Sequence, residues 1–154
     1  MADLFAYYEG ELKDFIAEAL ITKDTLLKRV ISMASESLVS DLRDLGIIID
    51  DTWRHTLDNS AVRHALKSHG SPKEVLRGQI PIKDKDLMLI PEIVASYESL
   101  SVEKNKRGQD VIIYTKTMED GITFYVEEIR LGRRELAAST MYKRKKDDSP
   151  TQID

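Results

Sequence analysis

The sequence predicts an α+β fold, with N-terminal helices followed by a four-stranded antiparallel β-meander. Apolar residues recur at helical spacing over residues 3–20 and 25–45. From Tyr97 onward the period changes, and runs of strand-forming residues alternate with short, glycine-containing segments typical of hairpin turns. Such a sheet needs helices over one of its faces, so we expect the helices and the sheet to pack together.

The composition places limits on the class of protein. The 154 residues are enough for one domain with a core, and 42% hydrophobic and 32% charged residues are ordinary values for a soluble protein. There is no apolar run long enough to span a membrane, and the acidic N-terminus is unlike a signal peptide. The absence of cysteine excludes disulfides and thiol catalysis and fits a reducing compartment, so we expect a cytoplasmic protein.

Charge is distributed unevenly along the chain. The net charge of −4 argues against a general nucleic-acid binder, but residues 1–58 hold six Lys/Arg and twelve Asp/Glu, against seventeen and fifteen in residues 59–154. The later part contains local basic clusters, which matter more than the sum when the partner is a phosphate chain. These clusters are Lys104, Lys106 and Arg107; Arg130, Arg133 and Arg134; and Lys143 to Lys146. They are equally compatible with solvated turns and a frayed tail.

The N-terminal segment, residues 1–46, is predicted to be a helical hairpin. The apolar stripe over residues 25–45 predicts a helix, which Asp24 or Thr25 can cap at its start and Gly46 can end. The two amphipathic helices could cover the core or form a homodimer surface.

Residues 47–70 hold every histidine of the chain and its only tryptophan. Residues 47–49, three consecutive isoleucines, predict a short buried strand, and a helical turn is expected over residues 50–53. A fresh helix start at residues 58–60 predicts a second helix that ends near His69, before Gly70. Two separate helical pieces could bring His55 and His64 together, whereas one continuous helix would point them in opposite directions.

No metal site is expected. His64 and His69 are five residues apart, which puts them about 140° apart around a helix, whereas a zinc-binding H-E-x-x-H helix needs both histidines on one face. The chain also has no cysteine for a mixed site.

The rest of the chain divides into short elements. Residues 71–74 form a capping box with proline at the first helical position, which predicts a short helix up to Gly78. Further pieces are expected as follows: a loop or strand fragment at 80–82, one turn at 84–88, a helix at 91–96, strands at 97–103, 111–117, 122–130 and 135–143, and a disordered tail at 147–154.

The last strand does not reveal which of its faces is buried. Strict alternation puts Leu136, Ala138, Thr140 and Tyr142 on one face, and Ala137, Ser139, Met141 and Lys143 on the other. Neither set is cleanly apolar. Hydroxyls and cations on a sheet suit phosphate binding, and they also suit an ordinary exposed sheet.

The order of motifs over about residues 47–146 is similar to that of a known family. R-H-A-L-K-S-H-G is followed by G-Q-I-P-I, I-P-E-I-V, Y-V-E-E-I-R and G-R-R-E-L-A-A-S-T-M-Y-K. This order resembles the phage-associated (PBECR-type) branch of the barnase–EndoU–colicin–RelE nuclease superfamily, found in polyvalent proteins of phages and mobile elements. Residues 1–46 lie outside the resemblance.

The resemblance implies a barnase/RelE-like fold and RNA cleavage without a metal or other cofactor. Histidine can serve as acid or base near neutral pH, which such a reaction requires. The candidate catalytic residues are His64, His69, His55, Thr140 and Tyr142. The candidate substrate-binding residues are Arg63, Lys116, Arg130, Arg134 and Lys143.

Three functions remain open at this stage. The first is a ribonuclease, such as a toxin or phage effector, acting on tRNA or another RNA and countered by an immunity or other partner protein. The second is an inactive module of the same fold that binds RNA or protein. The third is a phage structural or assembly protein that forms oligomers through its N-terminal helices.

Overall fold

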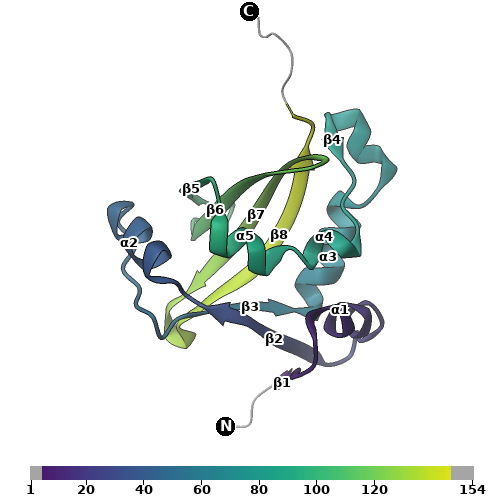
Figure 1. Ribbon diagram of the computed structural model, residues 1–154. Helices are drawn as coiled ribbons and strands as arrows, with labels where there is room; N and C mark the ends of the chain where they lie inside the picture. The colour runs from purple at the N-terminus through teal and green to yellow at the C-terminus, as the bar shows by residue number, and fades with distance from the viewer. Residues whose placement is uncertain (1–4, 147–154) are drawn as a thin grey trace, which may run out of the picture.

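A mixed eight-stranded β-sheet runs through the computed structural model, which describes residues 5–146 (Figure 1). Seven strands lie side by side in the order β1-β2-β3-β8-β7-β6-β5, and β4 pairs with β8. The strands are β1 (Phe5–Tyr7), β2 (Leu26–Met33), β3 (Arg54–Asp58), β4 (Gln79–Ile80), β5 (Ser99–Lys104), β6 (Asp110–Met118), β7 (Gly121–Arg130) and β8 (Glu135–Arg144). The predicted α+β fold class and the antiparallel meander of β5 to β8 are confirmed.

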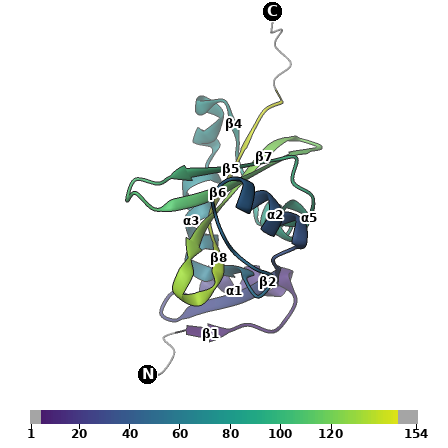
Figure 2. The same cartoon turned by 90° about the vertical axis from the view of Figure 1, so that its left-hand side faces the viewer.

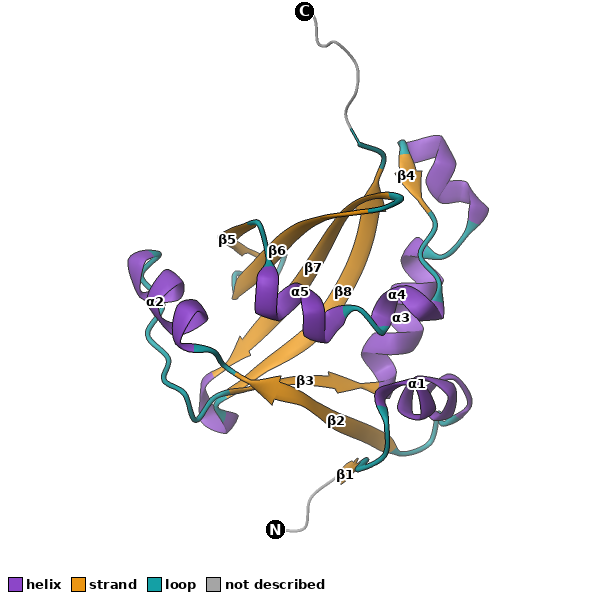
Figure 3. Cartoon of the chain, viewed as in Figure 1, coloured by secondary structure: helices purple, strands orange, loops and turns teal. Residues whose placement is uncertain are grey.

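Five α-helices and two 3-10 segments complete the fold (Figure 3). They are α1 (Leu12–Ile21), α2 (Glu36–Asp44), α3 (Asn59–His69), η1 (Pro72–Arg77), α4 (Asp84–Leu87), α5 (Ile90–Ser96) and η2 (Leu131–Arg133). α5 packs on β6, and α3 packs on both β8 and α1. Figure 2 shows α2 and α5 side by side, next to the β5–β6 hairpin. None of the helices within residues 5–146 is long and apolar enough to cross a membrane.

One edge of β8 is shared by two other strands. β3 pairs in parallel with the start of β8, where Arg54 lies opposite Glu135. β4 pairs antiparallel with its end, where Ile80 lies opposite Lys143. Because α3 and η1 connect β3 to β4, the chain leaves the edge of β8 and returns to it, and α3 is held against β8 in between.

The core lies between the helices and one face of the sheet, which we call the core face. It is built from α1, α2, α3, α5 and the inward side chains of β3, β6, β7 and β8. Fully buried members include Phe15, Leu38, Leu57, Ile93, Tyr114, Tyr125 and Met141. The side chains on the opposite face of β7 and β8, which we call the outer face, belong to Phe124, Val126, Glu128, Arg130, Ala137, Thr140, Tyr142 and Arg144.

The predicted helix over residues 25–45 is wrong, and with it the helical hairpin. Residues 26–33 form β2, which pairs with β1 and β3, and only residues 36–44 form a helix, capped by the Ser35 side chain. Leucine, valine and isoleucine in residues 26–31 fit a strand as well as a helix, and pairing with β3 decides between them. The sheet therefore extends into the N-terminal segment, and the predicted sheet of four strands was too small.

The buried strand predicted at residues 47–49 is also wrong, and the turn predicted at residues 50–53 is present but leads into a strand instead of a helix. Residues 47–50 have no regular structure, and Ile48 is 68% exposed. The Asp50 carboxylate accepts hydrogen bonds from the backbone N–H and the hydroxyl of Thr52. These hydrogen bonds form a turn that leads directly into β3. His55 therefore lies on a strand rather than on a helix. The helices predicted before His69, after Ser71 and at residues 91–96 are present, while the predicted disordered tail, 147–154, lies outside the described residues.

Candidate active site

A β-bulge in the last strand decides which side chains reach the outer face. Thr140 pairs with Val126 but Ala138 pairs with Glu127, so Ser139 is an extra residue. The bulge shifts the alternation by one position. Leu136, Ala138, Met141 and Lys143 consequently point to the core face, and Ala137, Thr140, Tyr142 and Arg144 point outward. The strict alternation predicted from the sequence is therefore broken in the middle of the strand.

His64 lines a polar cleft of about 290 Å³ beside the outer face. It is exposed on α3, and the cleft also contains Arg107 from the β5–β6 turn, Arg130 and Glu128 from β7, and Ser139 of the bulge. Both arginines contact the same carboxylate, with Nη2 of Arg107 3.2 Å and Nη2 of Arg130 3.4 Å from Glu128. The cleft thus combines an imidazole with two oriented guanidinium groups.

Arg130 is also tied to a buried ion pair. Its Nη1 lies 3.5 Å from a carboxylate oxygen of Glu135, and both oxygens of Glu135 lie 2.9 Å from Nζ of Lys28. Glu135 and Lys28 are each 1% exposed. Because Lys28 lies on β2, the N-terminal segment supplies the cation that balances the carboxylate behind Arg130.

His69 is held by a buried carboxylate at the other end of α3. Its Nδ1 lies 3.0 Å from Oε2 of Glu74, which is 1% exposed, and Nη1 of Arg77 donates to the other oxygen at 2.8 Å. When a neutral imidazole carries its proton on Nδ1, that nitrogen donates to the carboxylate and Nε2 can accept a proton. This contact fixes the orientation of the His69 ring.

The ring of His69 meets an aromatic pair on the outer face. Its centroid lies 5.5 Å from that of Tyr142, which stacks on Phe124 at 4.9 Å with planes 8° apart. The Arg144 guanidinium carbon lies 5.3 Å from the Phe124 centroid and 5.7 Å from the Tyr142 centroid. Burial raises the pKa of the Tyr142 phenol, although Arg144 opposes this shift, so the hydroxyl remains a neutral donor at physiological pH.

His55 lies apart from the other two histidines. It is 1% exposed on the core face, where its Nδ1 is 2.8 Å from Oε2 of Glu127. The hydroxyls of Tyr114 and Tyr125 donate to the same carboxylate at 2.6 and 3.0 Å. Burial first, and then Glu127, raises the pKa of both tyrosines. His55 therefore belongs to a buried network, and the expected meeting of His55 with His64 does not occur.

Three of the candidate substrate-binding residues make structural contacts away from the outer face. Arg63 donates through Nη1 to the backbone oxygens of Ala19 and Thr22 and so ties α3 to the end of α1. Lys116 donates to the backbone oxygen of Ser96 at 2.9 Å. Arg134 is exposed in the β7–β8 connection, with a left-handed φ of 52°.

Lys143 is buried on the core face, where it lies between two carboxylates. Its Nζ is 3.0 Å from Asp86 and 2.5 Å from Asp120. Burial opposes the charge of Lys143, but hydrogen bonds to Asp120 and Asp86 outweigh this effect and raise the pKa of the ammonium group. The bulge at Ser139 explains why Lys143 shares a face with Leu136, and Tyr142 with Ala137, the reverse of strict alternation.

Of the candidates, Arg130, Thr140 and Tyr142 lie on the outer face beside His64 and His69. The hydroxyl oxygen of Thr140 is buried and has no hydrogen-bond partner among the described residues. The sequence reasoning missed Glu74, which read as part of a helix cap, and Phe124, which no local pattern distinguishes from a core aromatic. No group of three or more metal-ligating side chains with suitable geometry occurs within residues 5–146.

A histidine-bearing helix along the edge of an antiparallel meander, with cations and aromatic rings on the open face, defines a nuclease-like α+β domain. The model of the phage-Barnase-EndoU-ColicinE5/D-RelE like nuclease3 family matches residues 33–149, which is most of the chain, and the chain belongs to that family. No curated protein and no solved structure matches the chain.

Proposed function

We propose that the chain is a metal-independent endoribonuclease and that its active site is the outer face of β7 and β8 together with His64 and His69 of α3. The observation that carries the proposal is the His69–Glu74 pair beside Tyr142. A buried carboxylate that orients a partly exposed imidazole is the arrangement expected of an acid–base group. His64, in its cleft with Arg107 and Arg130, supplies a second imidazole on the same helix.

The proposed reaction needs only these groups and RNA. One imidazole removes the proton of a 2′-hydroxyl, whose oxygen attacks the adjacent phosphorus. The bond from phosphorus to the 5′-oxygen breaks, and the second histidine, in its protonated form, donates a proton to that leaving oxygen. The products are a 2′,3′-cyclic phosphate and a free 5′-hydroxyl. Proton transfer of this kind typically accelerates a reaction by about 10²–10⁴-fold.

The surrounding side chains have distinct proposed roles. Arg107 and Arg130 stabilise charge on the phosphate oxygens, as fixed cations do when charge builds up in a transition state. Phe124, Tyr142 and Arg144 offer stacking surfaces to a nucleobase. The Tyr142 hydroxyl, beside His69, can donate a hydrogen bond to the substrate, and Thr140 lies on β8 between Tyr142 and the His64 cleft.

The test is an RNA cleavage assay in excess EDTA with product analysis. The wild type is expected to release 2′,3′-cyclic phosphate ends, and His64→Ala and His69→Ala are each expected to lower the rate by about 10²–10⁴-fold. Lys67→Ala is the matched control, because Lys67 is an exposed basic residue of the same helix outside the cleft. Equal cleavage by the wild type and a variant lacking both His64 and His69 would contradict the proposal.

One observation favours a second function, an inactive RNA-binding module. Arg107 and Arg130 both already contact Glu128, which offsets part of their charge. Such a module would bind RNA with steep salt dependence and leave it intact. Binding without cyclic-phosphate products under any metal or EDTA condition would favour this alternative.

A further inference from the structure

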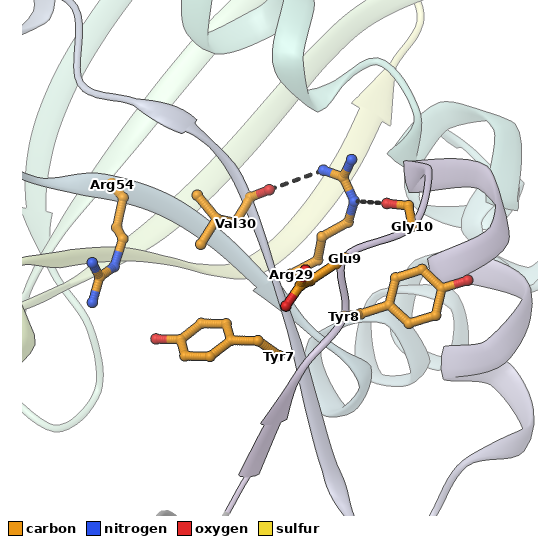
Figure 4. Close-up of a pocket in the computed structure, with 7 residues that line it drawn as sticks. All are labelled: Tyr7, Tyr8, Glu9, Gly10, Arg29, Val30 and Arg54. Carbon is orange, nitrogen blue, oxygen red and sulfur yellow. Dashed lines mark hydrogen bonds between the residues drawn. The ribbon is translucent and has the colours of Figure 1, made fainter.

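A second hollow lies on the sheet away from the histidines. It has a volume of about 470 Å³ and is lined by the end of β1, the segment that follows it, β2 and the start of β3 (Figure 4). Its lining residues lie outside the family-matched region 33–149, except Arg54. Any role of this hollow would therefore be particular to the N-terminal segment of this chain.

The side chains of this hollow suit a nucleotide. In Figure 4 the Tyr7 ring, from β1, and the Arg54 guanidinium, from β3, point toward each other across β2. Tyr7 is 43% exposed, so its ring is accessible for stacking. Nε of Arg54 is buried and finds no hydrogen-bond acceptor among the described residues. Because an unpaired buried donor is costly, a phosphate oxygen at this position would be stabilised.

The other arginine of the hollow serves to shape it. Arg29 donates through Nε to the backbone oxygen of Gly10 at 2.8 Å and through Nη1 to that of Val30 at 2.9 Å. These bonds fix the segment after β1 against β2, so the hollow is held open by internal contacts. Glu9 is the one acidic lining residue, against the two arginines.

The hollow and the His64 cleft lie along the same face of β3. Alternate residues of a strand share a face, so Arg54 and Asp58 point to the same side, and Asp58 lines the His64 cleft. Four residue steps span about 13 Å along a strand, which is the length of roughly four stacked nucleotides. Between them lies the Glu135 carboxylate, which contacts both Lys28 and Arg130.

We propose that the Tyr7–Arg54 hollow is a second RNA subsite, in which Tyr7 stacks a base and Arg54 binds a phosphate of the strand cleaved beside His64. This inference rests on the proposed ribonuclease function and extends it. The substrate is then a single strand that reaches roughly four nucleotides beyond the cleaved bond, from the Asp58 end of β3 toward its Arg54 end. The N-terminal strands contribute affinity and the choice of substrate length.

The test compares two 2′-O-methylated, uncleavable single-stranded RNA oligonucleotides. One fills only the cleft, and the other is about four nucleotides longer at both ends. The full-length wild-type chain is expected to bind the longer one at least about tenfold more tightly, because one stacked base and one charge-assisted hydrogen bond each change affinity by that order. Arg54→Gln and Tyr7→Ala should remove most of this advantage, and Tyr7→Phe should keep it.

Further readouts separate the subsite from a general charge effect. Arg54→Gln should reduce the slope of log affinity against log salt by about 0.7 for the longer strand, as expected for one lost phosphate contact. Arg43→Gln, in an exposed position on α2, is the matched control and should preserve the length advantage. If the wild type binds both lengths equally, or if both variants keep the full advantage, the subsite is disproved while the ribonuclease proposal stands. If neither strand is bound, and unmodified RNA of either length is left intact, both proposals fall.

Discussion

At the scale of single residues, the three histidines show how the environment divides one residue type into different roles. His55 is enclosed with Glu127 and two tyrosines, whereas His64 is exposed and His69 is partly exposed against Glu74. Among the three histidines, His69 is the one whose ring orientation is fixed by a single buried carboxylate, that of Glu74.

Glu74→Gln is expected to lower RNA cleavage by about 10- to 100-fold, because a hydrogen bond to a charged group contributes roughly 1.5–3 kcal/mol. The glutamine keeps the size of the side chain but can present its N–H₂ group to Nδ1, which would favour the other tautomer. The readouts are the cleavage rate and the His69 ring ¹⁵N chemical shifts. Glu92→Gln, an exposed change on α5, is the control. Unaltered ring shifts in Glu74→Gln would contradict the orienting role.

The Asp120–Lys143 contact predicts a dependence of stability on pH. The hydrogen bond from Lys143 lowers the pKa of Asp120 below its ordinary value of 3.8, so the stabilisation is present above that pH and is lost as the pH falls through the folded-state pKa. The raised pKa of Lys143 preserves the contribution up to at least the ordinary lysine value of 10.5, and the contribution is lost at higher pH.

Asp120→Asn should therefore lower the free energy of unfolding at pH 7, by at most about 1 kcal/mol because Asp120 is half exposed. Its difference from the wild type should shrink in strong acid. Urea unfolding at pH 7 and below pH 3.8 measures this, with Glu119→Gln as the exposed neighbouring control. A difference that grows in acid would show that the contact has been assigned the wrong sign.

At the scale of elements, the Ser139 bulge determines which residues of β8 lie on the outer face. If the strand alternated strictly through Ser139, Tyr142 and Thr140 would share a face with Leu136 and would point into the core. The faces of Thr140 and Tyr142 therefore follow from the unpaired position of Ser139 as much as from the pattern of side chains.

Deletion of Ser139 is expected to preserve the fold, because Thr140 would then follow Ala138 in regular alternation and Met141 would stay in the core. Ser139→Ala keeps the bulge and is the matched control. Far-UV circular dichroism and thermal unfolding of the two variants make the comparison. A deletion variant that fails to fold while Ser139→Ala folds would contradict this assignment of the bulge.

The local elements were the ones that the sequence could predict. α3 follows a capping aspartate, and β6, β7 and β8 follow one another through short turns, so their signals lie within a few residues. β2 and β3 could not be identified in this way, because they are stabilised by pairing with distant segments. His64, His69 and Tyr142 could be named as candidates, but the bulge that brings Tyr142 to the outer face leaves no mark in a single sequence.

At the scale of the whole molecule, the N-terminal segment and the nuclease-like meander share one sheet. The Lys28–Glu135 pair links β2 to β8, and Phe15 and Ile16 of α1 are buried in the common core. The family-matched region begins at residue 33 and so excludes α1 and nearly all of β2. We expect that region alone to lack part of its core.

Lys28→Met should destabilise the protein by roughly 3–5 kcal/mol, since it leaves the Glu135 carboxylate buried without its nearest cation. Combining it with Glu135→Leu should recover much of the loss, because two apolar side chains can replace a buried ion pair. Lys23→Met, an exposed change outside the helices and strands, is the control. Chemical unfolding of the four variants forms a double-mutant cycle, and additive losses would contradict direct coupling.

The same ion pair has a consequence for the order in which the protein matures. Lys28 and Glu135 are separated by 107 positions, so the contact behind Arg130 forms only after β8 has left the ribosome. A growing polypeptide would already carry all three histidines while it lacks the surface against which they act. The proposed RNA-cleaving site would therefore be assembled only once β8 has emerged, away from the peptidyl-transferase centre and the RNA that surrounds it.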